Sequence, residues 1–481
     1  MELTLIFLPI LAAFFVSLLV KRRSAMEYAT VAASLVVFVE SVSVAIRVSA
    51  NGPLTLAPIF SIDALGAILM STIALVGLFV SFYSVFYLRR EMDKGIIGFS
   101  RVRQYYMLMN LFLGAMLLAA TSSNPILTWI SIEATTLSTA FLISFYNKPE
   151  AMEAAWKYLI VNSVGLLLGF FGTLLYFTSL KTGAGAAVFT TWDSLLSNAT
   201  HLDPVVAKAA FVFVLIGYGT KVGLVPMHTW LPDAHSKAPV PISALLSGVL
   251  LNVAFIALLR FKAITDIAVG LDYSQKLLIV FGFLSICVAA FIMLVQKNYK
   301  RLLAYSSIEN MGIMAFGFGI GGLGAFAAIL HMVYHSLIKS ALFLSAGNIF
   351  LKYSSTKIKN VKGVLSVLPI TGALFITGFL AITGTPPFGI FLTKILIMSA
   401  GIKEHLFLSI AAVFLMAVLF VGFLKQVGAM MFGERPQEMD KSKESAWLIV
   451  SPLALIAIAL CLSFYVPHFM SVLLTSAVSR Y

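Results

Sequence analysis

Several acidic, basic and imidazole side chains occur inside long apolar stretches of this sequence. Two glutamates, Glu133 and Glu309, and two lysines, Lys221 and Lys394, stand out among them. In a membrane, each ionisable group near the bilayer centre costs on the order of 3 kcal/mol on insertion scales and normally lines an ion or substrate pathway. The alternative for each is a local structural ion pair or a cap near the headgroups. The candidates are Glu40, Asp63, Glu133, Lys221, His228, Asp233, Glu309, His331, His335, Lys339 and Lys394.

Two of these lysines stand next to prolines that interrupt apolar stretches. Lys221 precedes Pro226, and Lys394 follows Pro386 and Pro387. A proline inside a helix removes a backbone donor and clashes with the carbonyl four residues earlier, so each stretch should break there. Broken helices are tolerated at membrane depth only where they are buried in protein or line a polar cavity. We therefore expect two discontinuous helices, each with a lysine beside the break.

The same arrangement recurs along the chain at a nearly constant distance. Lys221 and Lys394 are 173 residues apart. Glu133 and Glu309 are 176 residues apart, and both end the tripeptide Ser-Ile-Glu. Because this offset contains five membrane spans, an odd number, the two halves must run in opposite directions. Inverted repeats with discontinuous helices are typical of ion-translocating transporters.

A third polar set consists of His331, His335 and Lys339. Their spacing of four places them along one flank of a helix. Histidines at this spacing can also bind zinc, but a zinc site needs a third protein ligand and no carboxylate is close in the sequence. Because imidazole changes charge near neutral pH, the flank suits proton transfer better. We expect no metal site.

The composition identifies the environment of these groups. Of 481 residues, 60% are apolar and 11% are charged, and the mean hydropathy is +0.99. Soluble domains carry about 25% charged residues, so soluble enzymes, nucleic-acid-binding modules and secreted disulfide scaffolds are excluded. The net charge of +13 is assigned to basic loops on one side of a membrane. Since Cys287 and Cys461 form no Cys-x-x-Cys motif, we expect neither an iron–sulfur cluster nor a c-type haem, and no cofactor in this chain.

At about 20 residues per crossing, the hydropathy predicts about fourteen spans, from 3–20 to 446–475. The first is followed, not preceded, by basic residues, so it is expected to be a retained helix rather than a cleaved signal. Loops after odd-numbered spans hold Lys21, Arg22, Arg23, Arg89, Arg90, Lys94, Arg101, Arg103, Lys297, Lys300, Arg301, Lys352, Lys357, Lys359, Lys362, Arg435, Lys441 and Lys443, and those after even-numbered spans hold mainly Lys181, Arg260 and Lys262. This asymmetry places both termini outside.

No loop exceeds about 25 residues, which predicts one polytopic membrane domain over 1–481. Its expected parts are an N-terminal three-span segment (1–100), a first repeat (101–265), a second, inverted repeat (270–435) and a C-terminal span (440–481).

These residues carry a resemblance to a known family. The stretch from Lys221 to Arg260, above all its core WLPDAH, resembles the antiporter-like subunits of respiratory complex I, Mrp-type cation/proton antiporters and energy-converting membrane-bound hydrogenases. Further matches, which extend the resemblance over nearly the whole chain, are Ser61–Leu65 with Asp63, Tyr305–Ile308, His331–Leu344 and Gly384–Lys394. The resemblance implies an all-α membrane protein with fourteen helices, two inverted five-helix repeats (spans 4–8 and 9–13) and broken helices 7 and 12. Longer relatives continue into a lateral amphipathic helix and a further span, and this sequence is expected to lack that brace.

The resemblance also implies roles for single residues. Glu133 corresponds to the fifth-span glutamate, Lys221 to its seventh-span lysine partner and Lys394 to the twelfth-span lysine or glutamate. The polar flank of the eleventh span corresponds to His331, His335 and Lys339. Accessory positions are Asp63, His228, Asp233, Asn252 and Glu309.

Two positions depart from the family pattern. Asn252 stands where many members have the eighth-span lysine, and Ser247 stands where another subtype has a histidine. The central relay is therefore expected to be less basic and to depend more on water. The segments SIEATT and LLSGVLLN resemble the subunit of hydrogenase-4 or formate hydrogenlyase. Glu40 is outside the pattern, and a lipid-headgroup or neighbouring-subunit contact is expected for it.

A switch follows from simple electrostatics. A nearby carboxylate favours the charged form of a lysine, and desolvation disfavours it. Glu133 lying against Lys221 would hold the proton, and its withdrawal would release the proton towards the eleventh-span flank and Lys394. Moving one charge through 100 mV takes about 2.3 kcal/mol, which nothing in this chain supplies. The driving force is therefore expected from a redox partner or an opposing ion gradient.

The expected function is a proton- or Na⁺/H⁺-translocating antiporter-like subunit of a membrane redox complex, closest to a membrane-bound hydrogenase or formate hydrogenlyase, in the plasma membrane of a prokaryote. The expected partners are other membrane subunits, a peripheral NiFe hydrogenase or dehydrogenase arm, the lipid bilayer and the ions H⁺ or Na⁺, with no nucleic acid. The alternatives are a subunit of an Mrp-type antiporter or of a complex I-like dehydrogenase, a non-pumping scaffold and a solute symporter. A quinone-processing enzyme would need redox-centre ligands, which do not appear here.

Overall fold

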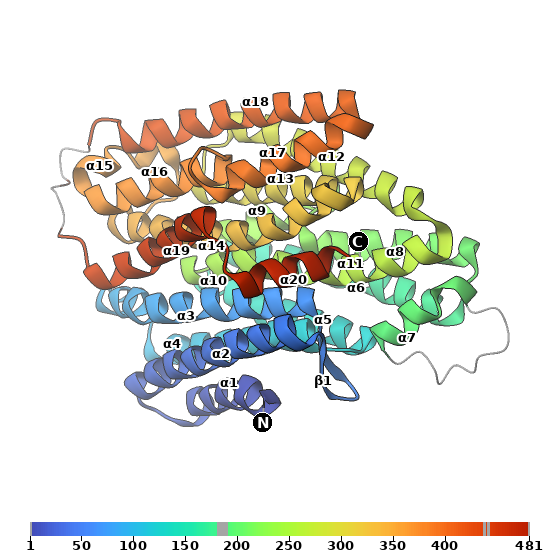
Figure 1. Cartoon of the computed structure of the whole chain (residues 1–481). Coiled ribbons are helices and arrows are strands. Elements are labelled where there is room, and N and C mark those ends of the chain that lie inside the picture. The colour runs from blue at the N-terminus through green and yellow to red at the C-terminus, as the bar shows by residue number, and fades with distance from the viewer. Residues whose placement is uncertain (1, 180–190, 436–438, 440–442, 480–481) are drawn as a thin grey trace.

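The computed structural model describes residues 2–179, 191–435, 439 and 443–479, and these residues are almost entirely helical (Figure 1). Lys181 and Lys441, two of the loop residues counted for sidedness, lie outside the described residues. The first ten helices are α1 (Glu2–Leu19), α2 (Arg23–Asn51), α3 (Ala64–Asp93), α4 (Phe99–Thr121), α5 (Pro125–Ile143), α6 (Pro149–Thr178), α7 (Trp192–Ser197), α8 (Pro204–Val222), α9 (Trp230–Lys237) and α10 (Val240–Leu245). The others are α11 (Leu251–Val269), α12 (Leu271–Val295), α13 (Tyr299–Ile320), α14 (Gly322–Tyr353), α15 (Val364–Val367), α16 (Pro369–Thr383), α17 (Gly389–Glu404), α18 (Leu406–Met431), α19 (Ala446–Phe464) and α20 (His468–Val478).

Short elements connect some of these helices. Two are single 3₁₀ turns, η2 (Ala199–His201) and η4 (Ile358–Asn360). A π-helical turn, η3 (Leu246–Leu250), joins α10 to α11. The antiparallel hairpin of β1 (Leu54–Ala57) and β2 (Phe60–Ile62) connects α2 to α3.

The protein is an all-α integral membrane protein. Twelve of its described helical segments are long and apolar enough to cross a membrane, with α10, η3 and α11 forming one of them. Two further crossings in the described chain are α13, which carries Lys300, Arg301 and Glu309, and the interrupted pair α16 and α17. Together they give the fourteen crossings that the hydropathy predicts.

Both expected helix breaks are present. Helix α8 ends where Gly223 adopts a left-handed φ of +84°, and α16 ends where Gly384 has a φ of +88°. Glycine adopts such angles without a steric cost from a Cβ atom. The prolines that lie in these two breaks are Pro226, Pro386 and Pro387. Lys221 is in the last turn of α8 and Lys394 is in the second turn of α17, so each break has a lysine beside it.

Two features differ from the expected spans. The crossing from Val240 to Val269 contains the π turn η3, where the regular backbone hydrogen-bond ladder is interrupted. The expected last span, 446–475, is too long, because α19 ends at Phe464 and a separate helix, α20, begins after Pro467. Proline has no N–H group with which to continue a helical ladder. Helix α20 then packs against α2, α3 and α14.

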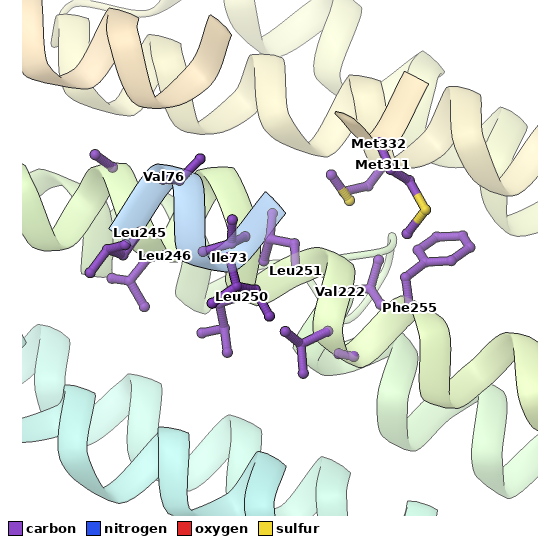
Figure 2. Close-up of a cluster of buried hydrophobic side chains, with 14 of the residues drawn as sticks. Ile73, Val76, Val222, Leu245, Leu246, Leu250, Leu251, Phe255, Met311 and Met332 are labelled. Carbon is purple, nitrogen blue, oxygen red and sulfur yellow. The ribbon is translucent and has the colours of Figure 1, made fainter. Parts of the chain in front are cut away.

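Helix α14 and the crossing 240–269 form the centre of the bundle. Their most apolar windows are 100% buried, compared with 22% for α1 and 33% for α18. Figure 1 shows α1 at one edge of the bundle and α18 at the opposite edge. Apolar side chains from α3, α8, α13, α14 and the crossing 240–269 pack together in the cluster of Figure 2, which includes Ile73, Val76, Val222, Leu245, Leu246, Leu250, Leu251, Phe255, Met311 and Met332. Polar side chains on α14 are therefore enclosed by protein.

Candidate functional site

Lys221 is completely buried at the end of α8. Its Nζ donates hydrogen bonds to Thr136 Oγ1 on α5 (2.8 Å) and to the hydroxyl oxygen of Tyr158 on α6 (2.7 Å). The Nζ atom also lies 4.8 Å from the centroid of the Tyr158 ring, within cation–π range. The Tyr158 hydroxyl makes a further bond with Thr139 (2.6 Å). Neutral hydroxyl groups therefore hold this lysine.

Glu133 belongs to the same region but does not form an ion pair with Lys221. One carboxylate oxygen, Oε1, accepts a hydrogen bond from Ser163 on α6 (2.6 Å). The other, Oε2, is buried and has no hydrogen-bond partner among the described residues. Because Glu133 is three residues before Thr136 on α5, the carboxylate and the lysine are close but unpaired. The direct contact between Glu133 and Lys221 that was expected for one state of the switch is absent here.

Lys394 shows the opposite arrangement. Its Nζ lies 2.8 Å from Glu309 Oε1 on α13 and forms a buried ion pair with it. The same Nζ lies 3.3 Å from the carbonyl oxygen of Thr383 and 3.4 Å from that of Ile382, at the end of α16. These carbonyls lack their usual helical partners because α16 stops there. The helix break therefore supplies backbone acceptors to the lysine, and Asn310 donates a hydrogen bond to the second oxygen of Glu309.

The eleventh-span flank lies against α13 and α17. His331 Nδ1 is 2.8 Å from Thr393 Oγ1, and its Nε2 is 2.9 Å from Asn310 Oδ1. Thr393 and Asn310 directly precede and follow the two residues of the ion pair, Lys394 and Glu309 respectively. One histidine ring therefore connects the helices that carry the acid and the base.

The other two residues of the flank follow at one-turn intervals. The rings of His331 and His335 are 6.5 Å apart between centroids, and His335 Nε2 is 3.3 Å from the carbonyl oxygen of Ser247 in the π turn. Lys339 donates to the carbonyl oxygen of Leu303 (2.8 Å) and to Ser306 Oγ. All three are completely buried. The described residues contain no group of three His, Cys, Asp or Glu side chains placed to hold a metal ion.

Asn252 occupies the middle of the crossing 240–269. Its amide nitrogen donates to Ser336 Oγ (2.9 Å) and lies near the carbonyl oxygens of Gly248 (3.2 Å) and Met332 (3.3 Å). Its Oδ1 is buried without a hydrogen-bond partner among the described residues. Ser247, the other departure from the family pattern, bonds to Ser307 Oγ (2.7 Å). Short neutral groups therefore stand at the expected position of the eighth-span lysine.

Four predicted residues lie away from this axis or at its margin. Asp63 caps α3 through Gly66 N (2.7 Å) and pairs with Arg260 (3.3 Å). Asp233 pairs with Arg301 and, at 3.3 Å, with Lys157. The other two are His228 and Glu40.

His228 lies in the first helix break, where its ring centroid is 6.2 Å from that of Tyr305. Glu40, which is outside the family pattern, pairs with Arg47 (3.0 Å), and Arg47 also contacts Glu2. The ion-pair alternative therefore describes Asp63, Asp233 and Glu40, whereas the other predicted charges gather around the two lysines and the α14 flank.

A buried polar cluster that the sequence reasoning missed extends from Lys339 towards the basic loops. The ring of His235 stacks on Phe343, one helical turn beyond Lys339, and neither ring nitrogen has a hydrogen-bond partner among the described residues. Lys300 Nζ donates to the carbonyl oxygen of Ala238, one turn beyond His235 (2.7 Å). Lys300 is 3% exposed, which is unusual for a lysine.

Glu91, at the end of α3, completes this cluster. It is completely buried and accepts a hydrogen bond from Tyr146 (2.6 Å), while its Oε2 has no partner among the described residues. Lys300 lies within electrostatic range of Glu91. Glu91 and Lys300 are close in sequence to basic loop residues, so the sequence predicts solvated charges at both positions. His235 was the one member of this cluster with a sequence signal, because it belongs to the WLPDAH motif.

Fold and site together define a class: a polytopic membrane protein in which two broken helices each present a buried lysine near a glutamate on a neighbouring helix. Residues 122–420 match the family described as NADH:quinone oxidoreductase/Mrp antiporter, TM. The chain belongs to this family, which confirms the resemblance seen in its sequence.

Individual relatives agree with this assignment. The chain is 40% identical over 374 residues to the hydrogenase-4 component F homolog of Methylacidiphilum infernorum (isolate V4), and the match covers 77% of each protein. It is 27% identical over 443 residues to hydrogenase-4 component B of Escherichia coli (strain K12), covering 85% of this chain and 63% of that protein. A chain of the Mrp complex from Dietzia sp. DQ12-45-1b has the same fold, with a TM-score of 0.88, 18% identity and coverage of 100% of this chain and 97% of that chain. The relatives are components of multisubunit membrane complexes.

Proposed function

We propose that this chain is an ion-translocating, antiporter-like subunit of a membrane redox complex of the hydrogenase-4 or formate hydrogenlyase type. The observation that carries the proposal is a difference between two equivalent buried lysines. Lys394 is paired with Glu309, whereas Lys221 is unpaired and Glu133 is turned to Ser163. One subunit therefore contains two similar glutamate–lysine sites, one with the two side chains in contact (the closed form) and one with them apart (the open form). Stepwise transfer of a cation requires both forms.

The chemistry of each step follows from charge and burial. A carboxylate in contact stabilises a buried ammonium group, and its withdrawal leaves the ammonium group to be stabilised by dipoles alone. In the open form, the ammonium group of Lys221 is held by the hydroxyls of Thr136 and Tyr158, whereas that of Lys394 has a carboxylate in contact. We propose that the proton moves by way of water and the α14 flank, His335 and His331, to the Glu309–Lys394 pair. Lys339 and the cluster of His235, Lys300 and Glu91 give this flank a polar route to the basic face.

The surroundings of the subunit form part of the proposal. The similarity to the hydrogenase-4 component F homolog supports other membrane subunits and a peripheral NiFe hydrogenase arm as partners, with that arm supplying the driving force for H⁺ or Na⁺. The basic loops support an orientation with both termini outside, and the similarity to hydrogenase-4 components of Methylacidiphilum infernorum and Escherichia coli supports the plasma membrane of a prokaryote. Segments 101–265 and 270–435 are proposed as the two inverted units, flanked by 1–100 and 440–481.

A second candidate function is that of a non-pumping scaffold. It is favoured by Asn252, whose amide is held by three acceptors in place of a titratable lysine, and by the apolar cluster that surrounds this part of the bundle (Figure 2). A scaffold needs the charges only for packing. Neutralising them would then leave ion transport by the complex unchanged.

The experiment that separates the two functions is transport by the purified complex in proteoliposomes. We expect Lys221→Ala to abolish proton or sodium movement while the peripheral redox activity remains measurable. The matched control is Lys208→Ala, which removes an exposed lysine from the same helix. Unchanged transport in a correctly assembled Lys221→Ala complex would establish the scaffold instead.

Glu133→Gln tests the switch more finely. It preserves size and hydrogen bonding to Ser163 but removes the charge that must approach Lys221. We expect coupling between redox turnover and transport to fail while assembly is intact. A complex that fails only to assemble would assign a structural role to Glu133.

A further inference from the structure

A recess of about 200 Å³ opens on the face of the protein that carries the basic loops. It lies where the end of α3, the end of α14 and the beginnings of α16 and α19 meet. Its floor includes Asn348, whose amide nitrogen is 3.3 Å from Thr371 Oγ1 and 3.2 Å from the carbonyl oxygen of Leu448. The floor is therefore fixed by hydrogen bonds between three helices.

Four cationic side chains line this recess: Arg90, Lys94, Lys352 and Lys443. None of them forms an ion pair with a carboxylate of the described residues, although Lys94 donates a hydrogen bond to the carbonyl oxygen of Leu351. The recess also contains Glu444, but this carboxylate is already occupied. It accepts hydrogen bonds from the backbone N–H groups of Ile370 (2.7 Å) and Thr371 (2.9 Å) at the start of α16, and from the Thr371 hydroxyl. A carboxylate at a helix N-terminus is stabilised by the helix dipole, so the uncompensated charge of the recess is positive.

Next to the cations, the same elements present aromatic rings at greater membrane depth. On α3, Phe82, Phe86 and Arg90 follow one another at intervals of four, which places them on one helix face. Trp447, the second residue of α19, comes four residues after Lys443, which precedes this helix. The Trp447 ring stacks on Phe86, with centroids 5.2 Å apart and planes 7° apart, and the residue is 56% exposed. Exposed tryptophans are enriched where a membrane protein meets the headgroup layer.

We propose that this recess binds the headgroup of an anionic phospholipid, with its phosphodiester among the four cations and one acyl chain along Phe82 and Trp447. Basic pockets between transmembrane helices on the cytoplasmic side are suited to anionic lipid headgroups. A free phosphate would use only the cations. A phospholipid would use both the cations and the aromatic face directly below them, which is why the observations favour a lipid. Such a lipid would join the last turns of α3 and α14 to the first turns of α16 and α19.

The test uses the purified complex and phosphatidylglycerol, with phosphatidylcholine as the neutral comparison. Native mass spectrometry would measure how much of each lipid the complex retains. Thermal unfolding would measure how far each lipid stabilises the complex. The variant Arg90→Gln/Lys443→Gln removes two recess cations, and Lys357→Gln/Lys359→Gln removes two exposed lysines of the same face that do not line the recess. Since each basic residue near an anionic surface contributes about fivefold to binding, the first variant should weaken phosphatidylglycerol binding about 30-fold and the second should not. Equal retention in both variants would overturn the proposal.

Two further measurements separate the lipid from other anions. Trp447→Ala should weaken retention of phosphatidylglycerol and leave any effect of inorganic phosphate unchanged. If inorganic phosphate alone stabilises the complex as well as phosphatidylglycerol does, the site is a simple anion site and the lipid assignment is wrong. If the complex shows no preference for phosphatidylglycerol over phosphatidylcholine, the recess does not select an anionic headgroup and the proposal is also wrong. None of these outcomes depends on ion transport, so they are independent of the proposed function.

Discussion

Lys394 contacts Glu309 at 2.8 Å across α17 and α13, and both side chains are buried. The pair is not isolated. Thr393 and Asn310, the neighbours of these two residues in sequence, hold the two ring nitrogens of His331. A change of charge on the ion pair is therefore felt directly by the first histidine of the α14 flank.

The pair makes a prediction about stability. Glu309→Gln would leave the ammonium group of Lys394 buried without a counter-ion, which costs about 3–5 kcal/mol. Lys394→Met should cost a similar amount, because it leaves the carboxylate of Glu309 buried without a cation. The double variant should lose about 1–3 kcal/mol less than the sum, because residues of one buried pair are energetically coupled. Unfolding of the four proteins in detergent micelles with increasing dodecyl sulfate measures these differences. Simple additivity would show that the two charges do not interact.

The surroundings of Lys221 predict a different effect at Tyr158. Tyr158→Phe removes one of the two hydroxyl groups that hold Lys221 and keeps the ring beneath its ammonium group. A hydrogen bond to a charged group contributes about 1.5–3 kcal/mol, so the variant destabilises the protonated Lys221 that each ion must pass through, and transport should fall about tenfold. The control is Tyr176→Phe on the same helix, which removes a buried hydroxyl that contacts Thr265 instead of a lysine. The measurement is the rate of ion transport in proteoliposomes. Equal rates for the two variants would show that the Tyr158 hydroxyl has no role in transport.

The sequence located the charged parts of this site because charges inside apolar stretches are rare. Glu133, Lys221, Lys394 and the α14 flank were found for that reason, and proline and glycine marked the two helix breaks. Their partners were not found. Hydroxyl and amide side chains such as Thr136 and Asn310 are common in transmembrane helices, so their type carries little information about which of them faces a charge.

Buried charges near helix ends were missed for the opposite reason. Glu91 follows Arg89 and Arg90, and Lys300 precedes Arg301, so hydropathy assigns all of them to solvated loops. Only the packing of α3, α9, α13 and α14 shows that two of these side chains are enclosed. Asp233, predicted as an accessory residue, forms ion pairs with Arg301 and Lys157, partners that its sequence position does not indicate.

The helix break beside Lys394 predicts that replacing Gly384 destabilises the protein. Gly384 has a φ of +88°, and a Cβ atom there would lie 3.1 Å from Cδ of Lys394. Left-handed backbone angles cost an L-residue about 1–2 kcal/mol, so Gly384→Ala should lower the melting temperature and displace the lysine. Gly428→Ala is the control, because it lies in the regular helix α18 with no atom within 4 Å of the added methyl group. Thermal unfolding in micelles should therefore separate the two alanine variants, and equal melting temperatures would mean that the break tolerates a side chain.

His235 offers a prediction in which stability and transport respond differently. Its ring is buried against Phe343, and both ring nitrogens lack a hydrogen-bond partner among the described residues. A buried polar group without a partner is destabilising, so His235→Phe should keep the stacking and leave stability equal or higher. The variant cannot carry a proton between Lys300 and Lys339, so transport should fall. His468→Phe, an exposed change at the start of α20, should alter neither quantity. The comparison needs thermal unfolding and proteoliposome transport on the same preparations. A stable His235→Phe complex with full transport would show that this histidine serves packing alone and that protons reach Lys339 by another route.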